Sequence, residues 1–153
     1  MLNFRPYTEI DQKIDDLHRE ATSYKKTDID KAIHCLKKAK LLMKKTEGIL
    51  LAQRLRLPLF LQQAGKFDEA ILEFEQLLKS AIPRAEKDLA IYQEPLLIEY
   101  RVYQDFYQIY DKMRLICERE NLQERSKKYS QLGEKYKIYH TELRKILDKQ
   151  SIL

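Results

Sequence analysis

The chain has few residues that break helices and few that could anchor a cofactor. Among its 153 residues there are three glycines, four prolines, two cysteines and no tryptophan. Three glycines do not make the glycine-rich loop that cradles a phosphate group, and the scarcity of glycine and proline indicates helices with short connections. Alternation of apolar and polar residues never persists over five positions, so no strand is predicted. We therefore expect an all-α fold and no cofactor.

Residues suited to metal binding or catalysis are scattered along the chain. Cys35 and Cys117 lie far apart, and His18, His34 and His140 match no metal-ligand spacing. His18 and His34 could approach each other across the first helix pair, but two histidines without a third ligand or a nucleophile indicate neither a metal site nor a catalytic site. We predict a protein that is not an enzyme, with free thiols in a reducing compartment.

No apolar run in the sequence is long enough to cross a bilayer. The longest runs, ILLA and LPLFL, are only a few residues each. The opening segment, MLNFRPYTEIDQ, lacks the apolar core of a secretion signal. These absences predict a cytoplasmic protein that makes no contact with membranes.

Positive charge is concentrated in one segment. The formal net charge is +5, yet residues 31–66 alone carry nine basic residues and one acidic residue, a net +8. Five lysines of this segment fall on one predicted helix: Lys37, Lys38, Lys40, Lys44 and Lys45. They are interpreted either as the solvated face of an amphipathic helix or as a surface that steers an acidic partner. No nucleic-acid-binding motif accompanies them, which disfavours nucleic acid as that partner.

Apolar residues recur at helical spacing and predict about six helices. The expected ranges are 8–24, 28–45, 49–64, 68–82, 83–119 with a break at Pro95, and 123–149. Thr8 and Asp28 are suited to cap the first two helices, because their side chains can accept a hydrogen bond from the first turn. Pro58 is expected to kink the third helix, Gly65 to end it, and Pro83 to begin the fifth.

The segment RLRLPLFLQQAGKFDEAILEFEQLL, residues 54–78, has a glycine in a turn, an aromatic residue just after it, and alternating small and large residues down the next helix. These positions are occupied by Gly65, Phe67, Ala70 and Phe74, with Leu77 at the last small site. Glycine provides the backbone freedom of the turn, alanine lets paired helices approach closely, and the aromatic residues fill the space between them. The segment resembles a tetratricopeptide repeat, which pairs two antiparallel helices over about 34 residues.

The resemblance implies a short right-handed superhelix of helix pairs with a concave binding face. We predict one domain over residues 1–153, with pairs at 8–45, 49–82 and 83–149, the last divergent and lengthened. By register, the groove-facing side of the third helix would carry Ala52, Leu55, Leu59, Gln62 and Gln63. The basic and asparagine pattern with which some members of the family clamp a C-terminal carboxylate is absent there, so that ligand is not predicted.

A row of tyrosines is the most unusual feature of the chain. Tyr100, Tyr103, Tyr107 and Tyr110 follow one another at intervals of three and four residues. They form a stripe about 120° away from an aliphatic stripe on the same predicted helix. One interpretation is that the tyrosine side packs on another helix with its hydroxyls at the rim. The other is an open tyrosine-lined groove, because tyrosine is enriched at protein interfaces.

These patterns predict a non-enzymatic scaffold that binds a protein or peptide through a concave, tyrosine-rich surface. Two alternatives stay open: a dedicated inhibitor, such as an immunity protein, or a secretion chaperone, each binding one cognate protein. A nucleic-acid-binding adaptor is a weaker alternative. Self-association into a homodimer through the exposed apolar stripe is also open.

Overall fold

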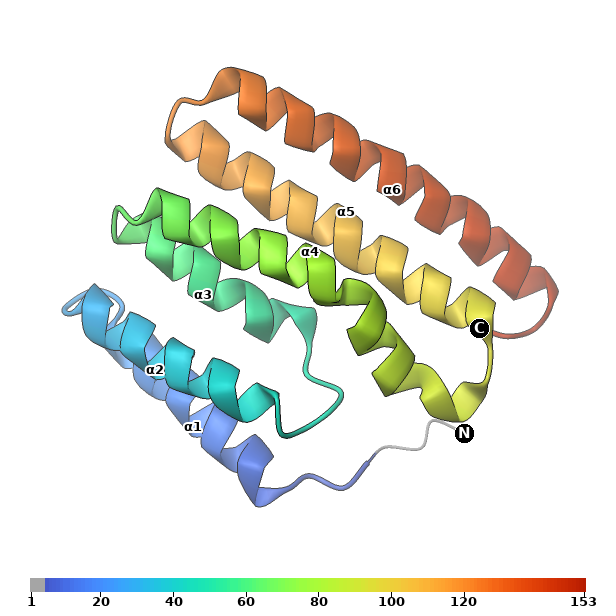
Figure 1. The fold of residues 1–153 in the computed structure, drawn as a ribbon, viewed down its shortest axis with the longest axis horizontal. Coiled ribbons are helices and arrows are strands. Elements are labelled where there is room, and N and C mark those ends of the chain that lie inside the picture. Colours follow the sequence, from blue (N-terminus) through green and yellow to red (C-terminus); the bar gives the residue numbers. More distant parts are fainter. Residues whose placement is uncertain (1–4) are drawn as a thin grey trace. The chain divides into compact units, whose positions relative to one another are not determined.

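The computed structural model describes residues 5–153, and within this range it contains helices and no strand, which confirms the predicted all-α class. The six helices are α1 (Glu9–Tyr24), α2 (Ile29–Met43), α3 (Leu51–Gln63), α4 (Phe67–Leu89), α5 (Pro95–Arg119) and α6 (Gln123–Lys149), with a 3-10 turn η1 (Ala90–Tyr92) before α5 (Figure 1). The chain divides into two compact units, one extending to Lys66 and the other comprising Phe67–Leu153. We call them unit 1 and unit 2. Their boundary falls inside the predicted pair 49–82, so the pairing of α3 with α4 stays a prediction.

Unit 1 begins with two helices whose first turns are capped by the residues that the sequence indicates. The side chain of Thr8 accepts a hydrogen bond from the Asp11 amide, and the Asp11 carboxylate accepts one from the Thr8 amide, which completes a capping box. The side chain of Asp28 accepts a hydrogen bond from the Lys31 amide at the start of α2. Each cap satisfies amides that the helix itself leaves unpaired, which explains why the two helices begin where they do.

The core of unit 1 lies between α1 and α2. Ile14, Ala39 and Met43 are its buried centre. The partly buried residues that pack against this centre are Ile10, Leu17, Leu42 and Ile49. Helix α3 contacts α2 and also bonds to α1 through side chains, so unit 1 consists of three mutually supporting helices.

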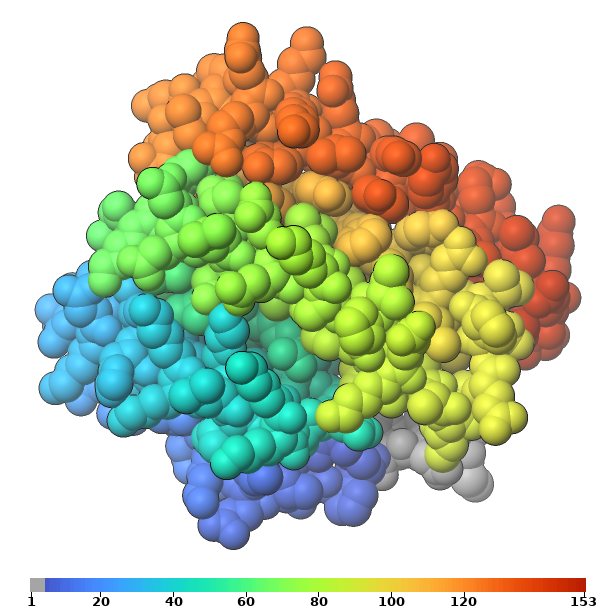
Figure 2. Space-filling view, in the orientation of Figure 1, coloured from blue at the N-terminus to red at the C-terminus, as the bar shows by residue number. Residues whose placement is uncertain are grey.

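Unit 2 contains α4, η1, α5 and α6, with α5 placed between the other two long helices (Figure 1). In the space-filling view, the side chains of α6, coloured orange to red, form one edge of this unit (Figure 2). Arg84 of α4 forms an ion pair with Asp105 of α5 at 3.3 Å, and both side chains are largely buried. Helix α5 therefore has one side that packs on α4 and another that is available to α6.

The prediction that a new helix begins at Pro83 is wrong. Helix α4 continues through Pro83 as far as Leu89. Arg84, the next residue, donates hydrogen bonds to the carbonyls of Leu77 and Ser80, at 2.8 and 3.3 Å, and so supplies donors to the turn that precedes the proline. The chain leaves the helical course only after η1, where Gln93 adopts a φ of 49°.

Candidate functional site

All four tyrosines of the predicted row lie on α5, are half-buried, and direct their rings at rings of α6. The rings that meet between the two helices are Tyr100, Tyr103, Phe106, Tyr107 and Tyr110 of α5 and Tyr129, Tyr136, Tyr139 and His140 of α6. We call this set the aromatic cluster. It agrees with the interpretation that the tyrosine side packs on another helix, but that packing leaves the tyrosines of the cluster partly exposed.

Within the aromatic cluster, the His140 ring packs against the rings of two tyrosines of α5, Tyr100 and Tyr107. The Tyr100 ring stacks on the imidazole at 4.3 Å between ring centres, and the Tyr107 ring meets it edge-on at 5.2 Å. His140 is buried, and among the described residues its Nε2 atom has no hydrogen-bond partner. Burial, with a smaller contribution from the charge of Arg144, lowers the pKa of His140. The neutral ring therefore acts as an aromatic packing residue.

Tyr136 connects the other members of the cluster. Its ring stacks with Tyr110 at 5.9 Å, meets Phe106 edge-on at 4.9 Å, and lies 5.9 Å from both Tyr103 and Tyr139. Aromatic pairs at such distances contribute about 0.5–1.5 kcal/mol each beyond the area that they bury. The cluster is therefore a principal source of the attachment of α6 to α5.

Gly133 allows the two helices to approach each other beside these rings. A Cβ atom placed at Gly133 would lie 3.6 Å from the Tyr110 Cβ and 3.7 Å from the Tyr107 carbonyl oxygen. The backbone of α6 thus lies close to the surface of α5 at this point. A small residue here sets how closely the rings on either side can pack.

The contribution of α6 is not among the predicted features, although the sequence of α6 carries a signal for it. The residues of α6 that are buried or half-buried beside α5 recur at intervals of three and four: Ser126, Tyr129, Gly133, Tyr136, His140, Leu143 and Leu147. This is the spacing of a helix that packs along a single partner helix. Read together with the tyrosine row, it would have indicated α6 as the partner of that row.

One edge of the aromatic cluster remains open and carries charge. Tyr139 is 43% exposed and its neighbour Ile138 is 52% exposed. The ammonium group of Lys135 lies 5.4 Å from the Tyr136 ring centre and 5.8 Å from that of Tyr139, where a cation is attracted to the ring faces. Tyr103, Tyr136, Tyr139, Lys135 and Ile138 together form what we call the aromatic edge.

The Tyr103 hydroxyl marks the α5 side of the aromatic edge. It donates a hydrogen bond to the Glu99 carboxylate. That bond, with smaller contributions from burial and nearby charges, raises the pKa of Tyr103 to about 12. The hydroxyl therefore stays protonated and is suited to hydrogen bonding, whereas a nucleophile would need a lowered pKa.

The other residues predicted to contact a partner belong to unit 1. On α3, Leu55 and Gln62 are buried, Leu59 is half-buried and Gln63 is exposed. The five predicted lysines lie on α2 or at its C-terminal end: Lys37, Lys38, Lys44 and Lys45 are exposed, and Lys40 is half-buried. Their roles in steering and in binding stay predictions.

A row of polar contacts joins α3 to α1 in unit 1. Arg56 donates to the Nδ1 atom and the backbone carbonyl of His18, each at 2.9 Å, and to the Thr22 hydroxyl at 2.7 Å. Burial, together with the charge of Arg56, lowers the pKa of His18 to about 4. His34 is exposed. His18, the possible neighbour of His34, is thus bound by Arg56.

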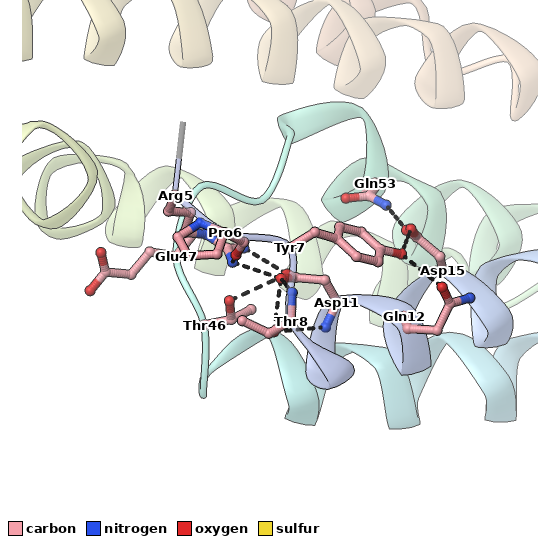
Figure 3. A network of polar contacts seen from close by, with 10 residues as sticks. All are labelled: Arg5, Pro6, Tyr7, Thr8, Asp11, Gln12, Asp15, Thr46, Glu47 and Gln53. Atoms are coloured by element: carbon pink, nitrogen blue, oxygen red, sulfur yellow. Dashed lines mark hydrogen bonds and ion pairs between the residues drawn. The ribbon is translucent and has the colours of Figure 1, made fainter. Parts of the chain in front are cut away.

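A second polar network holds the segment before α1 (Figure 3). Arg5 donates to both carboxylate oxygens of Asp11, at 2.7 and 2.6 Å, and to the Glu47 carbonyl at 2.8 Å. The Thr46 hydroxyl donates to Asp11 at 3.4 Å. The hydrogen bonds from Arg5, together with those from Thr8, hold the pKa of Asp11 well below its usual range. This network ties the entry to α1 to the loop between α2 and α3.

Tyr7 continues that network along α1 (Figure 3). Its hydroxyl donates to the Asp15 carboxylate, which also accepts a hydrogen bond from Gln53 of α3 at 3.1 Å. The bond to Asp15 is the main reason why the pKa of Tyr7 rises to about 12. These contacts are structural links between elements of unit 1.

Residues 5–153 contain no group of three or more histidine, cysteine or acidic side chains that could hold a metal ion. Both cysteines are buried free thiols, and burial raises the pKa of Cys35 and of Cys117. Over the same residues, none of the helices combines the length and the apolar character needed to cross a bilayer. Comparison with family models, with curated proteins and with solved structures found no match for this chain.

Proposed function

We propose that this protein is a non-enzymatic helical scaffold that binds another protein through the aromatic edge of unit 2. The observation that carries the proposal is that the aromatic cluster is only half covered by α5 and α6. Tyr139 and Ile138 expose about half of their side chains beside the rings of Tyr103 and Tyr136. Large rigid rings with a polar tip and a neighbouring cation are typical of the residues that dominate binding energy at interfaces.

The aromatic edge is already ordered before a partner arrives. Tyr103 is held by Glu99, and the rings of Tyr136 and Tyr139 are held by each other and by Lys135. Rings that are fixed in this way lose little further conformational entropy on binding, which favours affinity. The half-buried rings are thus suited both to attach α6 and to contact a partner.

The binding proposal is tested by capture of partners from an extract of the cells that make the protein. We expect the tagged chain to retain one or a few proteins, identified by mass spectrometry, and the double variant Ile138→Gln/Tyr139→Gln to lose them. Leu72→Gln is the matched control, because Leu72 is a similarly exposed apolar residue on α4, 57% exposed. Equal capture by all three proteins would refute the assignment of the aromatic edge. Far-ultraviolet circular dichroism establishes that the variants keep their helices.

We also propose that the chain is related to the tetratricopeptide-repeat proteins that residues 54–78 resemble. Gly65 supports this resemblance, because it follows α3 with a φ of 76°, a left-handed conformation that favours glycine. Ala70 and Phe74 support it too, since both are completely buried on α4. An unchanged free energy of unfolding in Phe74→Ala would count against it, because the repeat uses this aromatic residue to fill its core. We place the protein in the cytoplasm, because buried free thiols are typical of reducing compartments.

A further inference from the structure

Helix α6 carries a second apolar row beside the residues that pack on α5, and only Tyr139 belongs to both, because its ring also meets Tyr103 of α5. Leu132, Tyr139 and Ile146 recur at every seventh residue, and Ile138 stands beside the middle one. Tyr139 is 43%, Ile146 is 46% and Ile138 is 52% exposed, whereas Leu132 is half-buried. A seven-residue repeat of apolar residues indicates a helix that packs lengthwise along another helix. We call this row, with the charged residues between its members, the outer face of α6.

Apart from Tyr139, whose ring also meets Tyr103, the outer face is turned to the side of α6 that does not pack on α5. Successive helical residues are rotated by about 100°, so Tyr139 lies about 60° from Tyr136 and about 100° from His140, which both contact α5. Lys135 and Glu142 lie on the opposite side of Tyr139 from those two residues, about 40° and 60° away from it. The outer face therefore has an apolar row along one side, from Leu132 to Ile146, and a charged row beside it.

We infer that the outer face of α6 pairs with the outer face of a second copy of this chain, antiparallel, about a two-fold axis at Tyr139. This inference rests on the proposed function, because it names a second copy of the chain as a protein that binds at the aromatic edge. A two-fold interface must be complementary to itself. In the antiparallel register, Tyr139 meets Tyr139 of the second copy, and Leu132 lies level with Ile146 of the second copy. The apolar row is thus matched along its whole length.

The charges of the outer face are complementary in the same register. Lys135 falls within one residue, about 1.5 Å along the helix axis, of the level of Glu142 of the second copy, and Glu142 falls equally close to the level of Lys135 of the second copy. A parallel pairing would instead place each of these charges beside the same residue of the second copy, where like charges repel each other. The charge pattern therefore selects the second copy as occupant and the antiparallel direction.

These charges are free to change partners at little cost. Within one chain, Lys145 forms an ion pair with Glu142 at 3.0 Å, and each side chain of that pair is 63% exposed. Exposed ion pairs of this kind contribute little to stability. Lys135 lies against the exposed side of Tyr136 and Tyr139. Pairing with a second copy would exclude water from these charges and so strengthen their attraction.

The register also brings one pair of like charges together. Lys128 falls level with Lys149 of the second copy at each end of the paired helices. Both lysines are exposed, and helices that cross at an angle diverge towards their ends, so this repulsion is weakened by solvent. It nevertheless distinguishes the antiparallel pairing from other arrangements, because removing it should strengthen the dimer.

The inference is tested by measuring the mass of the purified chain over a range of concentrations, by sedimentation and by light scattering. We expect the mass to rise from 18.4 kDa towards twice that value as the concentration increases. Lys135→Glu should weaken the dimer about tenfold or more, and Lys135→Glu/Glu142→Lys should restore it to within about threefold. Lys128→Glu should strengthen the dimer. Lys137→Glu is the matched control, because this exposed lysine lies on the opposite side of α6 and should have little effect.

Each other outcome overturns the inference. A chain that stays monomeric at every concentration has no such interface, and a dimer that Lys135→Glu leaves unchanged uses another surface. A dimer that Lys135→Glu breaks and the double charge exchange does not restore has a different register. A monomeric chain whose captured partners are still lost on mutation of Ile138 and Tyr139 would reject this inference and leave the proposed function standing. All substituted positions in this test are exposed, and circular dichroism verifies the fold.

Discussion

Helix α6 lies close to α5 at Gly133, beside the aromatic cluster, and this contact predicts what a side chain added at Gly133 would do. Gly133→Ala adds one methyl group, whose nearest neighbours would be the Tyr110 Cβ at 3.6 Å, the Tyr107 carbonyl oxygen at 3.7 Å and the Asp111 amide at 3.9 Å. All three distances are ordinary van der Waals contacts. The methyl group therefore fills the available space and pushes nothing aside.

The magnitude follows from the helix propensity of the two residues. Gly133 lies inside α6, where alanine is favoured over glycine by about 1 kcal/mol. With no clash to offset this gain, we expect Gly133→Ala to raise the free energy of unfolding by about 0.5–1 kcal/mol and Tm by about 1–4 °C. Gly133→Leu has no room beside the backbone of α5, so we expect it to lower the free energy by about 1–3 kcal/mol, as overpacking does.

The assay is urea unfolding followed by far-ultraviolet circular dichroism, with the near-ultraviolet signal of the tyrosines reporting on the aromatic cluster. Ser130→Leu serves as the control for an added leucine, because Ser130 is an exposed residue of α6. We expect Gly133→Leu to change the tyrosine signal and Ser130→Leu to leave it unchanged. Destabilisation by Gly133→Ala of more than about 1 kcal/mol would refute the reasoning, because the helices would then have to be closer than the contacts described above.

Three further predictions concern charged and titratable groups. Arg5→Gln removes the bidentate partner of Asp11 and should lower the free energy of unfolding by about 1–2 kcal/mol at neutral pH. Because the pKa of Asp11 is lowered in the folded state, this loss should be complete above the unfolded pKa of 3.8 and should shrink as the pH falls below it. Urea titrations at several pH values would measure this. Asp105→Ala leaves Arg84 buried without its carboxylate and should cost about 3–5 kcal/mol, most of it recovered in Asp105→Ala/Arg84→Met; equal stability of the single and double variants would contradict this. His140→Phe keeps the ring stacking and removes a group whose pKa is lowered below 6.5 in the folded state. The wild type loses stability as the pH falls through 6.5, and the variant should retain part of that stability. Identical pH profiles of unfolding for the two proteins would count against this.

The sequence predicted the features that depend on neighbours within one or two helical turns. Thr8 and Asp28 were recognised as caps because an N-cap bonds to amides two or three residues away. The two stripes of α5 were recognised because apolar residues at intervals of three and four share a helix face. The start of a helix at Pro83 was predicted wrongly because proline lacks one amide donor and often stands at a helix boundary, whereas α4 continues through it, with the Arg84 side chain bonded to the carbonyls of the preceding turn.

What covers each stripe was decided by tertiary structure. The tyrosine side of α5 faces α6 and the Asp105 side faces α4, and neither assignment follows from the periodicity of α5 alone. The periodicity of a helix shows only which of its faces are apolar. Which helix packs on such a face depends on the fit between two faces that are distant in sequence. Here the two faces also fit at Gly133, where a Cβ atom would lie only 3.6 Å from the Tyr110 Cβ beside the rings. The same packing leaves Ile138 and Tyr139 exposed, because the side chains of one helix cannot all face a single neighbour.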